Sequence, residues 1–319
     1  MIRIAVALAA ALLVANNALA QAWPAKPIRI IVNIAAGGVA DNTIRLMSPA
    51  LAETLKQPVV IENRAGGEGY IGLEAVVRAP ADGYTFLFAA GSGTMITPHI
   101  VDRKDIDVLS DLVPVAPTVR ITMYLTVPTT SPSKNLTEFL AYLRANPGKA
   151  SYGSAGTGSA LHLAAEVFKR DAKVDMQHVP FKGAGPAMQA LLGGHVDCVF
   201  DPGIGLANAK AGKTRLIAVA SGRRHPDFPD VPTLAEVGIK EVDGGPFFGV
   251  YAPKGTPAEI VQRMNAAVMQ AMSDPTVRQR FEAGGLEIAA PMTPDAFAKY
   301  VRSESERWGK LVRELGVKQ

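Results

Sequence analysis

A strand, a glycine-rich joint and the start of a helix follow one another in IRIIVNIAAGGVAD, residues 28–41. The β-branched run Ile28–Val32 comes after the breakers Pro24 and Pro27 and has the length of a strand. Beyond Asp41, apolar residues recur at helical spacing, namely Ile44, Leu46, Met47, Leu51 and Leu55. This stretch therefore predicts one β-loop-α unit whose joint is built from small residues.

The same alternation continues along the chain. Strands are predicted at residues 59–63 and 84–88, with a helical segment at 71–77 between them. A second series has predicted strands at 150–152, 177–179, 196–200 and 216–220, and predicted helices at 136–145, 159–170, 185–192 and 204–211. Such alternation predicts an α/β protein with mostly parallel sheets flanked by helices.

Two passages break this alternation and suggest two domains. Residues 118–127 are rich in strand formers, with Pro114, Pro117 and Pro128 as predicted breakers, and we interpret them as a first crossing between domains. Residues 247–251 are interpreted as the return crossing, and the tail from Pro257 is predicted to be helical. The second unit is therefore expected to be inserted into the first.

Composition excludes several classes of protein. The 319 residues are 48% hydrophobic and 19% charged, which excludes a disordered chain and fits about two domains. The net charge of +4 is spread without a dense basic run, and aromatic residues make up 6%, so no nucleic-acid partner is expected. The single cysteine, Cys198, excludes an intramolecular disulfide and a cysteine-based zinc site, and it is expected in the core.

Residues 1–20 have the pattern of a cleavable signal peptide. Arg3 is followed by an apolar stretch over 4–15, and the segment ends in Ala18-Leu19-Ala20, a small-x-small cleavage site. No later segment reaches about 18 consecutive apolar residues. We therefore expect a soluble, exported protein that does not itself cross the membrane.

Catalytic motifs are absent from the sequence. Ser154 has Tyr152 and Gly156 at the two positions where a nucleophile elbow needs glycines, so it does not match, and the five histidines show no metal-ligand spacing. The glycine-rich stretch 153–158 matches neither the dinucleotide fingerprint nor the phosphate loop of nucleotide hydrolases. We expect no enzyme activity, no cofactor and no metal.

Two loops remain as candidate binding sites, at residues 35–41 and 154–159. Each follows a predicted strand and opens a helix, whose first N–H groups lack intrahelical partners and lie at the positive end of the helix dipole. Glycines there let the backbone approach an anion, and hydroxyls of Ser154, Thr157 and Ser159 can donate to a carboxylate. Because ligands of open α/β sheets bind at such strand ends, we expect both loops to share one interdomain site.

Three further residues have two interpretations each. Asp41 is either a helix-start acid or a residue that orients the binding loop. Asp201 is either a turn residue or an acceptor for a ligand amine, hydroxyl or water. Ser92 lies in a glycine-rich joint at a comparable strand edge and is a weaker candidate contact.

Several segments resemble the Bug-type solute receptors of tripartite tricarboxylate transporters. They occur in order along the chain: WPAKPIRIIV at 23–32, AGGVAD at 36–41, QPVVIENR at 57–64, DGYT at 82–85, YGSAGTGS at 152–159, HLA at 162–164, HVPFKG at 178–183, PDVPT at 229–233 and ERWG at 306–309. The sequence departs from the family at Asn33-Ile34-Ala35, where Pro-Phe and a small residue are usual. It also departs at Val39-Ala40, Phe181 and Phe248. These departures leave anion capture intact but prevent a specific ligand assignment.

The resemblance implies a type II periplasmic-binding fold with two lobes and two crossovers. Lobe 1 is expected to comprise residues 21–120 and 246–319, and lobe 2 residues 121–245. The implied function is capture of a small carboxylate and its delivery to the membrane components of a tripartite tricarboxylate transporter by an expected monomer. The expected ligand-binding residues are Ile34, Ala35, Gly37, Gly38, Asp41, Ser92, Ser154, Ala155, Thr157, Gly158, Ser159 and Asp201.

Two other functions remain open at this point. The closed receptor could signal to a membrane kinase instead of feeding transport, which the sequence does not distinguish. A secreted hydrolase is the second alternative, and the missing triad argues against it.

Overall fold

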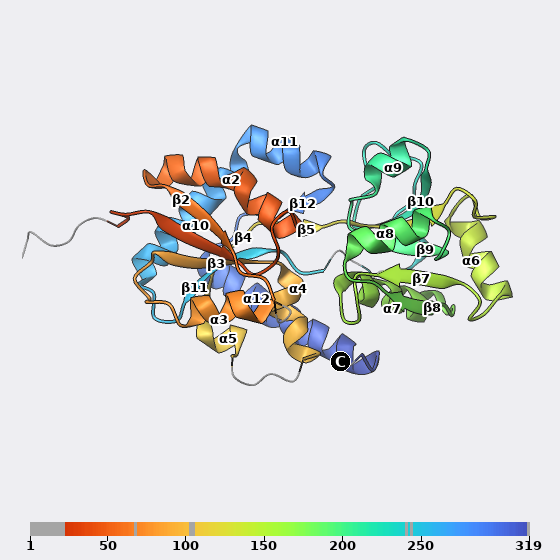
Figure 1. Ribbon diagram of the computed structural model, residues 1–319, viewed down its shortest axis with the longest axis horizontal. Coiled ribbons are helices and arrows are strands. Elements are labelled where there is room, and N and C mark those ends of the chain that lie inside the picture. Colours follow the sequence, from red (N-terminus) through yellow and green to blue (C-terminus); the bar gives the residue numbers. More distant parts are fainter. Residues whose placement is uncertain (1–22, 67–68, 102–105, 240–241, 243–244, 318–319) are drawn as a thin grey trace, which may run out of the picture.

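A computed structural model describes residues 23–66, 69–101, 106–239, 242 and 245–317 (Figure 1). The predicted signal peptide, residues 1–20, lies outside the described residues. The described chain forms two lobes, each built around a five-stranded sheet, so the predicted α/β class with two mostly parallel sheets is confirmed.

The sheet of the first lobe has the order β2-β1-β3-β11-β4. β1 is parallel to β2 and β3, whereas β11 is antiparallel to both of its neighbours. The strands are β1 (Ile28–Val32), β2 (Val59–Asn63), β3 (Thr85–Ala89), β4 (Leu112–Pro117) and β11 (Gly249–Pro253).

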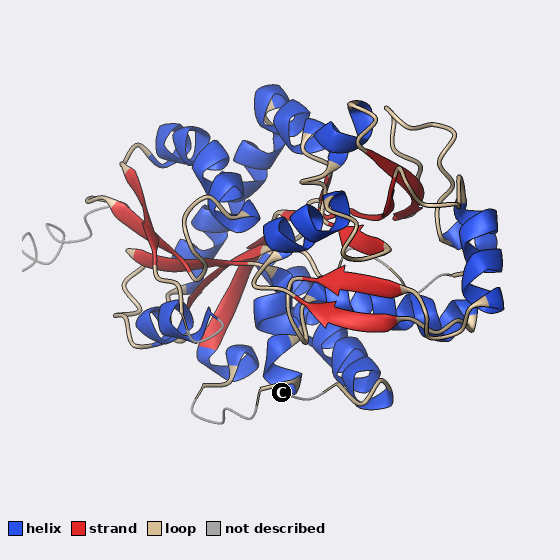
Figure 2. Ribbon diagram, turned by 45° about the vertical axis from the view of Figure 1, so that its right-hand side comes forward, coloured by secondary structure: helices blue, strands red, loops and turns tan. Residues whose placement is uncertain are grey.

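Helices cover both faces of this sheet (Figure 2), which explains why its strands β3 and β11 are buried along their whole length. Ile28, Ile30 and Val32 of β1 share a core with α2 (Val39–Leu55) and α10 (Ala258–Ser273). Ile31 points to the opposite face, toward α3 (Tyr70–Val77) and the start of α12 (Pro294–Glu314). Successive side chains of a strand alternate between faces, so each face has its own core.

The sheet of the second lobe has the order β10-β6-β9-β7-β8, with β6 antiparallel to its neighbours. Its strands are β6 (Met123–Pro128), β7 (Ser151–Ser154), β8 (Gln177–Pro180), β9 (Cys198–Asp201) and β10 (Thr214–Ala220). The helices around it are α6 (Leu136–Ala145), α7 (Ala160–Ala172), α8 (Ala184–Leu192) and α9 (Leu206–Lys210). Cys198 is fully buried in this core, as predicted.

Two extended segments cross between the lobes side by side. The first passes from β4 through β5 (Val119–Ile121) to β6, and β5 pairs with β12 (Leu286–Ile288). The second returns into β11. The Thr118 N–H donates to the Phe248 carbonyl at 2.8 Å, and the Phe248 N–H donates to the Val119 carbonyl at 2.6 Å. These bonds make the crossing a short paired connection. Both predicted crossings overlap it, and their remaining residues lie in β6 and β11.

The last helix spans both lobes. Phe297 and Val301, near the start of α12, lie in a core of the first lobe, whereas Trp308, Leu311 and Val312 lie in the core of the second. The predicted residue ranges of the lobes assign all of 246–319 to lobe 1. Those ranges stay a prediction.

Two local predictions were wrong. Pro114 was predicted to break structure, but it lies inside β4, which is an edge strand with an irregular register opposite Val250 and Tyr251. An edge strand beside a bulge tolerates a residue without an N–H. Ser92 was predicted in a glycine-rich joint, but it lies in the short helix α4 (Gly91–Met95).

The remaining elements are short or peripheral. They are η2 (Thr97–His99), α5 (Val108–Asp111), η3 (Ala235–Val237) and α11 (Pro275–Ala283).

Candidate functional site

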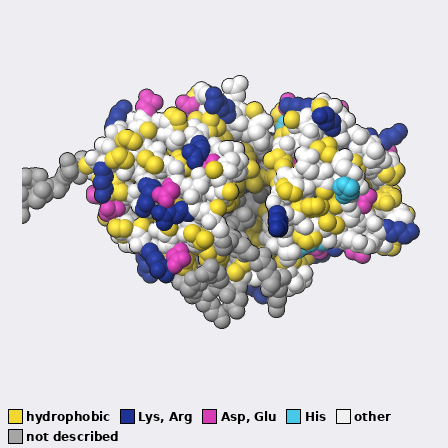
Figure 3. Space-filling model, in the orientation of Figure 1, with side chains coloured by type: hydrophobic (Ala, Val, Ile, Leu, Met, Phe, Trp, Pro, Cys, Tyr) yellow, Lys and Arg dark blue, Asp and Glu magenta, His cyan; other side chains and the backbone are white. Residues whose placement is uncertain are grey.

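A groove separates the two lobes in the space-filling view (Figure 3). One cavity of about 290 Å³ lies between Val39 and Asn42 of α2 and residues 202–204, which follow β9 in the other lobe. A second cavity, of about 280 Å³, lies between residues 155–159 and residues Thr97, Ile100 and Val101. Residues of each loop thus line a cavity together with residues of the other lobe.

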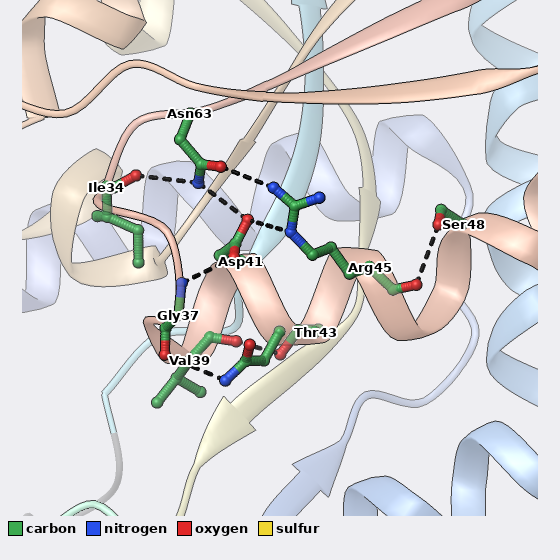
Figure 4. A network of polar contacts seen from close by, with 9 residues as sticks. Ile34, Gly37, Val39, Asp41, Thr43, Arg45, Ser48 and Asn63 are labelled. Atoms are coloured by element: carbon green, nitrogen blue, oxygen red, sulfur yellow. Dashed lines mark hydrogen bonds and ion pairs between the residues drawn. The ribbon is translucent and has the colours of Figure 1, made fainter.

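In the first loop, Asp41 organises the backbone (Figure 4). Its carboxylate accepts from the Gly37 N–H at 2.8 Å, from Arg45 Nε at 2.9 Å and from Asn63 Nδ2 at 2.9 Å. Burial alone would raise the pKa of Asp41, but these hydrogen bonds together hold it below its ordinary value. Asp41 is buried and fully bonded within the protein, so its interpretation as the residue that orients the loop fits the structure best.

The donors left for a ligand in the first loop differ from those expected. The Gly37 N–H is used by Asp41, and the Gly38 N–H points to the Ala35 carbonyl at 3.4 Å. Gly37 has a φ of +82°, which favours glycine. Among the described residues, no acceptor bonds to the N–H groups of Ala35 and Ala36, and both residues are exposed. The glycines therefore shape the loop, while the alanine N–H groups remain available.

In the second loop, Ser154 is also engaged inside the protein. Its side chain is fully buried, its Oγ lies 2.6 Å from His178 Nε2, and it accepts from the Gly156 N–H at 3.1 Å. The sequence predicts that this hydroxyl donates to a carboxylate; the structure instead uses it to hold the loop. Ser154 is buried at the carboxyl end of β7, so its hydroxyl bonds to other groups of the protein.

Some of the other residues of the second loop are likewise bonded inside the protein, and others are exposed. The Gly158 N–H donates to His162 Nδ1 at 3.0 Å, and Ser159 caps α7 by accepting from the His162 N–H at 3.2 Å. Thr157 is exposed at the tip of the loop. The Ala155 N–H has no acceptor among the described residues. Like the first loop, this one is braced internally and presents an alanine N–H.

Asp201 lies one strand away, at the end of β9, which pairs with β7. It is 1% exposed, and its Oδ2 accepts from the N–H groups of Gly203 and Gly205 at 3.1 and 2.9 Å. Its Oδ1 is buried without a partner among the described residues. Burial raises the pKa of Asp201 to about 6, against the lowering effect of the two N–H bonds. The carboxyl group thus keeps one acceptor unused.

Ser92 and Ile34 occupy different surroundings. Ser92 is half-buried in the first turn of α4, after β3, and Ile34 packs beside Gly38, with its carbonyl accepting from Asn63 Nδ2 at 3.2 Å. Ile34 therefore belongs to the braced first loop. Ser92 lies at the neighbouring strand end, because β1 and β3 pair.

The sequence interpretation missed four residues that shape the site. Asn63 joins the Asp41 network, and His162 and His178 support the second loop. Asn33, at the end of β1, is 5% exposed and its Oδ1 has no partner among the described residues. One signal was readable, since Asp41 and His162 each come four residues after a loop glycine. The contacts of Asn63 with Asp41 and of His178 with Ser154 join residues distant in sequence.

Within the described part of the chain, no three His, Cys, Asp or Glu side chains gather as potential metal ligands. Over the same residues, every helix is too short or too polar for a membrane span.

Comparisons with known proteins find one matching family and several similar solved structures. Residues 43–317 match the family described as tripartite tricarboxylate transporter family receptor. Protein BugT of Bordetella pertussis is 35% identical over 308 residues, which cover 94% of this chain and 92% of BugT. An R. palustris protein solved with adipate has a TM-score of 0.82 and 30% identity, covering 93% of this chain and 99% of its own. MatC from Rhodopseudomonas palustris, solved with bound malate, has a TM-score of 0.77 and 32% identity, covering 91% and 100%.

Proposed function

The chain belongs to the tripartite tricarboxylate transporter receptor family, which confirms the resemblance, and from this premise we propose that it is a periplasmic receptor for a small organic carboxylate. The ligand binds in the groove between the lobes and is delivered to the membrane components of a tripartite transporter. One observation supports the proposal: two braced loops, one from each lobe, border cavities between the lobes and contain no cationic side chain, although Arg280 also lines the first cavity.

The chemistry of such a site suits carboxylates. The starts of α2 and α7 add partial positive charge, and hydrogen bonds from N–H groups to a carboxylate are stronger than those between neutral groups. Closure of the lobes removes water and strengthens each of these bonds. Adipate and malate in two related structures are both small organic acids, which supports the same class here.

Binding should depend on the second loop. At Gly158 φ is +77°, and a Cβ would lie 2.8 Å from Ile100 Cδ1. We expect Gly158→Val to weaken carboxylate binding at least about a hundredfold, which corresponds to about 2.7 kcal/mol. Isothermal titration calorimetry against mono- and dicarboxylates, aliphatic and aromatic, measures this loss.

Gly212→Val is the matched control. Gly212 has a φ of +69°, nothing lies within 4 Å of its would-be Cβ, and it follows the far end of α9. It carries the same backbone strain without touching the groove. Equal affinity in both variants would exclude the loop as the site. Binding of neutral sugars but of no carboxylate would exclude the proposed ligand class.

A further inference from the structure

Two histidines lie directly behind the second binding loop, and the proposed function gives neither a role. His162 is in the first turn of α7, and His178 is on β8. Their rings are stacked, with centroids 4.0 Å apart and planes 16° apart. Tyr152 of β7 extends the stack, 4.9 Å from His178 at 17°.

Each histidine is bonded to the loop. The Gly158 N–H donates to His162 Nδ1, so this nitrogen carries no proton and the ring is neutral. His178 Nε2 contacts Ser154 Oγ, which in turn accepts from the Gly156 N–H. These bonds hold Gly156 and Gly158, the two glycines on either side of the exposed Thr157.

The first loop has the same hydrogen-bond arrangement with a different acceptor. Gly37 and Gly158 both have positive φ, and each N–H donates to the side chain four residues later, Asp41 in one lobe and His162 in the other. Asp41 remains an acceptor when ionised. His162 ceases to accept at Nδ1 when that nitrogen is protonated. Protonation therefore weakens the acceptor in both loops, and at His162 Nδ1 it removes the acceptor altogether.

The surroundings of the pair are mixed in charge. Glu166 and Lys169 of α7 form an ion pair at 2.9 Å, Glu166 also accepts from the Tyr152 hydroxyl, and Lys169 approaches Asp175 at 3.7 Å. Cys198 of β9 stays protonated because burial raises its pKa. Burial lowers the pKa of His162 to about 4, with a contribution from His178, and burial also lowers the pKa of His178.

We propose that His162 and His178 are positioning residues for the carboxylate site, which hold loop 154–159 in its binding conformation only while both rings are neutral. Protonation removes the acceptor of the Gly158 N–H and places like charges in stacked rings. The loop then loses its shape and releases the ligand as the solution becomes acidic. This inference rests on the proposed function as a carboxylate receptor.

Four variants test the proposal. His162→Leu removes the acceptor, whereas His162→Asn supplies a carbonyl oxygen near the position of Nδ1 that does not titrate. His178→Gln supplies an amide near the position of Nε2 in the same way. His195→Gln is the control, since His195 is exposed and lies outside the loop.

Calorimetry from pH 7.5 to pH 4 measures the affinity for a carboxylate that the unsubstituted protein binds. Protonation of the ligand affects all variants equally. The ratio of the Kd of a variant to the Kd of the unsubstituted protein at the same pH therefore reports on the protein. We expect His162→Leu to bind at least about tenfold more weakly at pH 7.5 while it remains folded by circular dichroism. His162→Asn and His178→Gln should keep most of the affinity at pH 7.5 and lose less of it at pH 4.

A second measurement needs no ligand. The amide signal of Gly158 in NMR spectra should shift with the titration of His162 in the unsubstituted protein and should not titrate in His162→Asn. An amide signal that ignores pH, or a His162→Leu variant with unchanged affinity and an unchanged pH profile, would overturn the positioning role. If no carboxylate binds any variant but the amide titrates, the proposed function fails and the loop support stands.

Discussion

At the scale of single residues, Asp201 shows how burial and hydrogen bonding oppose each other. Its Oδ2 accepts two backbone N–H groups, yet its Oδ1 faces no donor among the described residues. Burial outweighs the two bonds and raises the pKa to about 6. An ionised carboxylate therefore costs the folded state free energy at neutral pH, a cost that a ligand or water donor would offset.

Asp201→Asn should raise thermal stability at pH 8. The folded-state pKa lies above the ordinary 3.8, so the stability of the unsubstituted protein falls as pH rises from about 4 through 6. Asparagine stays neutral and its carbonyl can accept the same two N–H groups. At about 1.4 kcal/mol per pKa unit, the free energy of unfolding of Asp201→Asn at pH 8 should exceed that of the unsubstituted protein by up to about 3 kcal/mol. This difference should vanish near pH 3.

Thermal melts at pH 3 and pH 8 measure this difference. Asp230→Asn is the control, because Asp230 is exposed. A gain that is equal at both pH values would show that the buried charge is not its source.

At the scale of an element, the start of α2 depends on a carboxylate that lies inside the helix. Gly38 caps α2 without a side-chain hydrogen bond, and Asp41 bonds the preceding Gly37 instead. Arg45, one turn later, joins Asp41 to Asn63 of β2 at 2.9 and 2.8 Å. The helix start, the loop and the neighbouring strand thus form one unit.

Asp41→Asn should destabilise the protein at pH 7 by about 1.5–3 kcal/mol, the range for hydrogen bonds to charged groups. The pKa of Asp41 is lowered, so its contribution is present above pH 3.8 and is lost as the pH falls further. The difference from the unsubstituted protein should therefore shrink in acid.

Urea unfolding at pH 7 and pH 3 measures this effect. Glu53→Gln, an exposed acid on the same helix, should change stability little at either pH. A deficit of Asp41→Asn that persists unchanged in acid would contradict the role of the charge.

At the scale of the whole molecule, α12 connects the two lobes. Its Trp308 is 2% exposed in a core that includes Ile96 and Ile100 as well as β6 and α7 of the second lobe. His99 Nε2 and Ser305 Oγ, 2.9 Å apart, add a polar contact along the same helix. The core of the second lobe is therefore completed by Ile96 and Ile100 of the first lobe and by the end of α12.

Trp308→Ala should destabilise the protein by about 3–5 kcal/mol, as expected for a large aromatic side chain removed from a core. Trp308→Phe retains part of the ring volume and should lose less. Chemical denaturation followed by circular dichroism measures both. A loss below about 1 kcal/mol in Trp308→Ala would mean that the end of α12 is not packed as described.

The sequence alone determined much of the fold. Leu136–Ala145 forms the helix that its spacing predicts, and the strands at 59–63 and 216–220 lie within or match β2 and β10. The order of the motifs along the chain was enough to identify the family. These features depend on residues close in sequence, whose periodicity and turn chemistry are visible in the chain itself.

Only the tertiary structure decided which groups of the two loops are used internally and which remain available. The contacts of Ser154 with His178, of Asp41 with Asn63 and of α12 with the second core join residues 22 or more positions apart in the chain. Local patterns carry no information about such partners, because a side chain bonds whichever neighbour the packing of distant elements brings to it. The loops were therefore predictable, but the orientation of their donors was not.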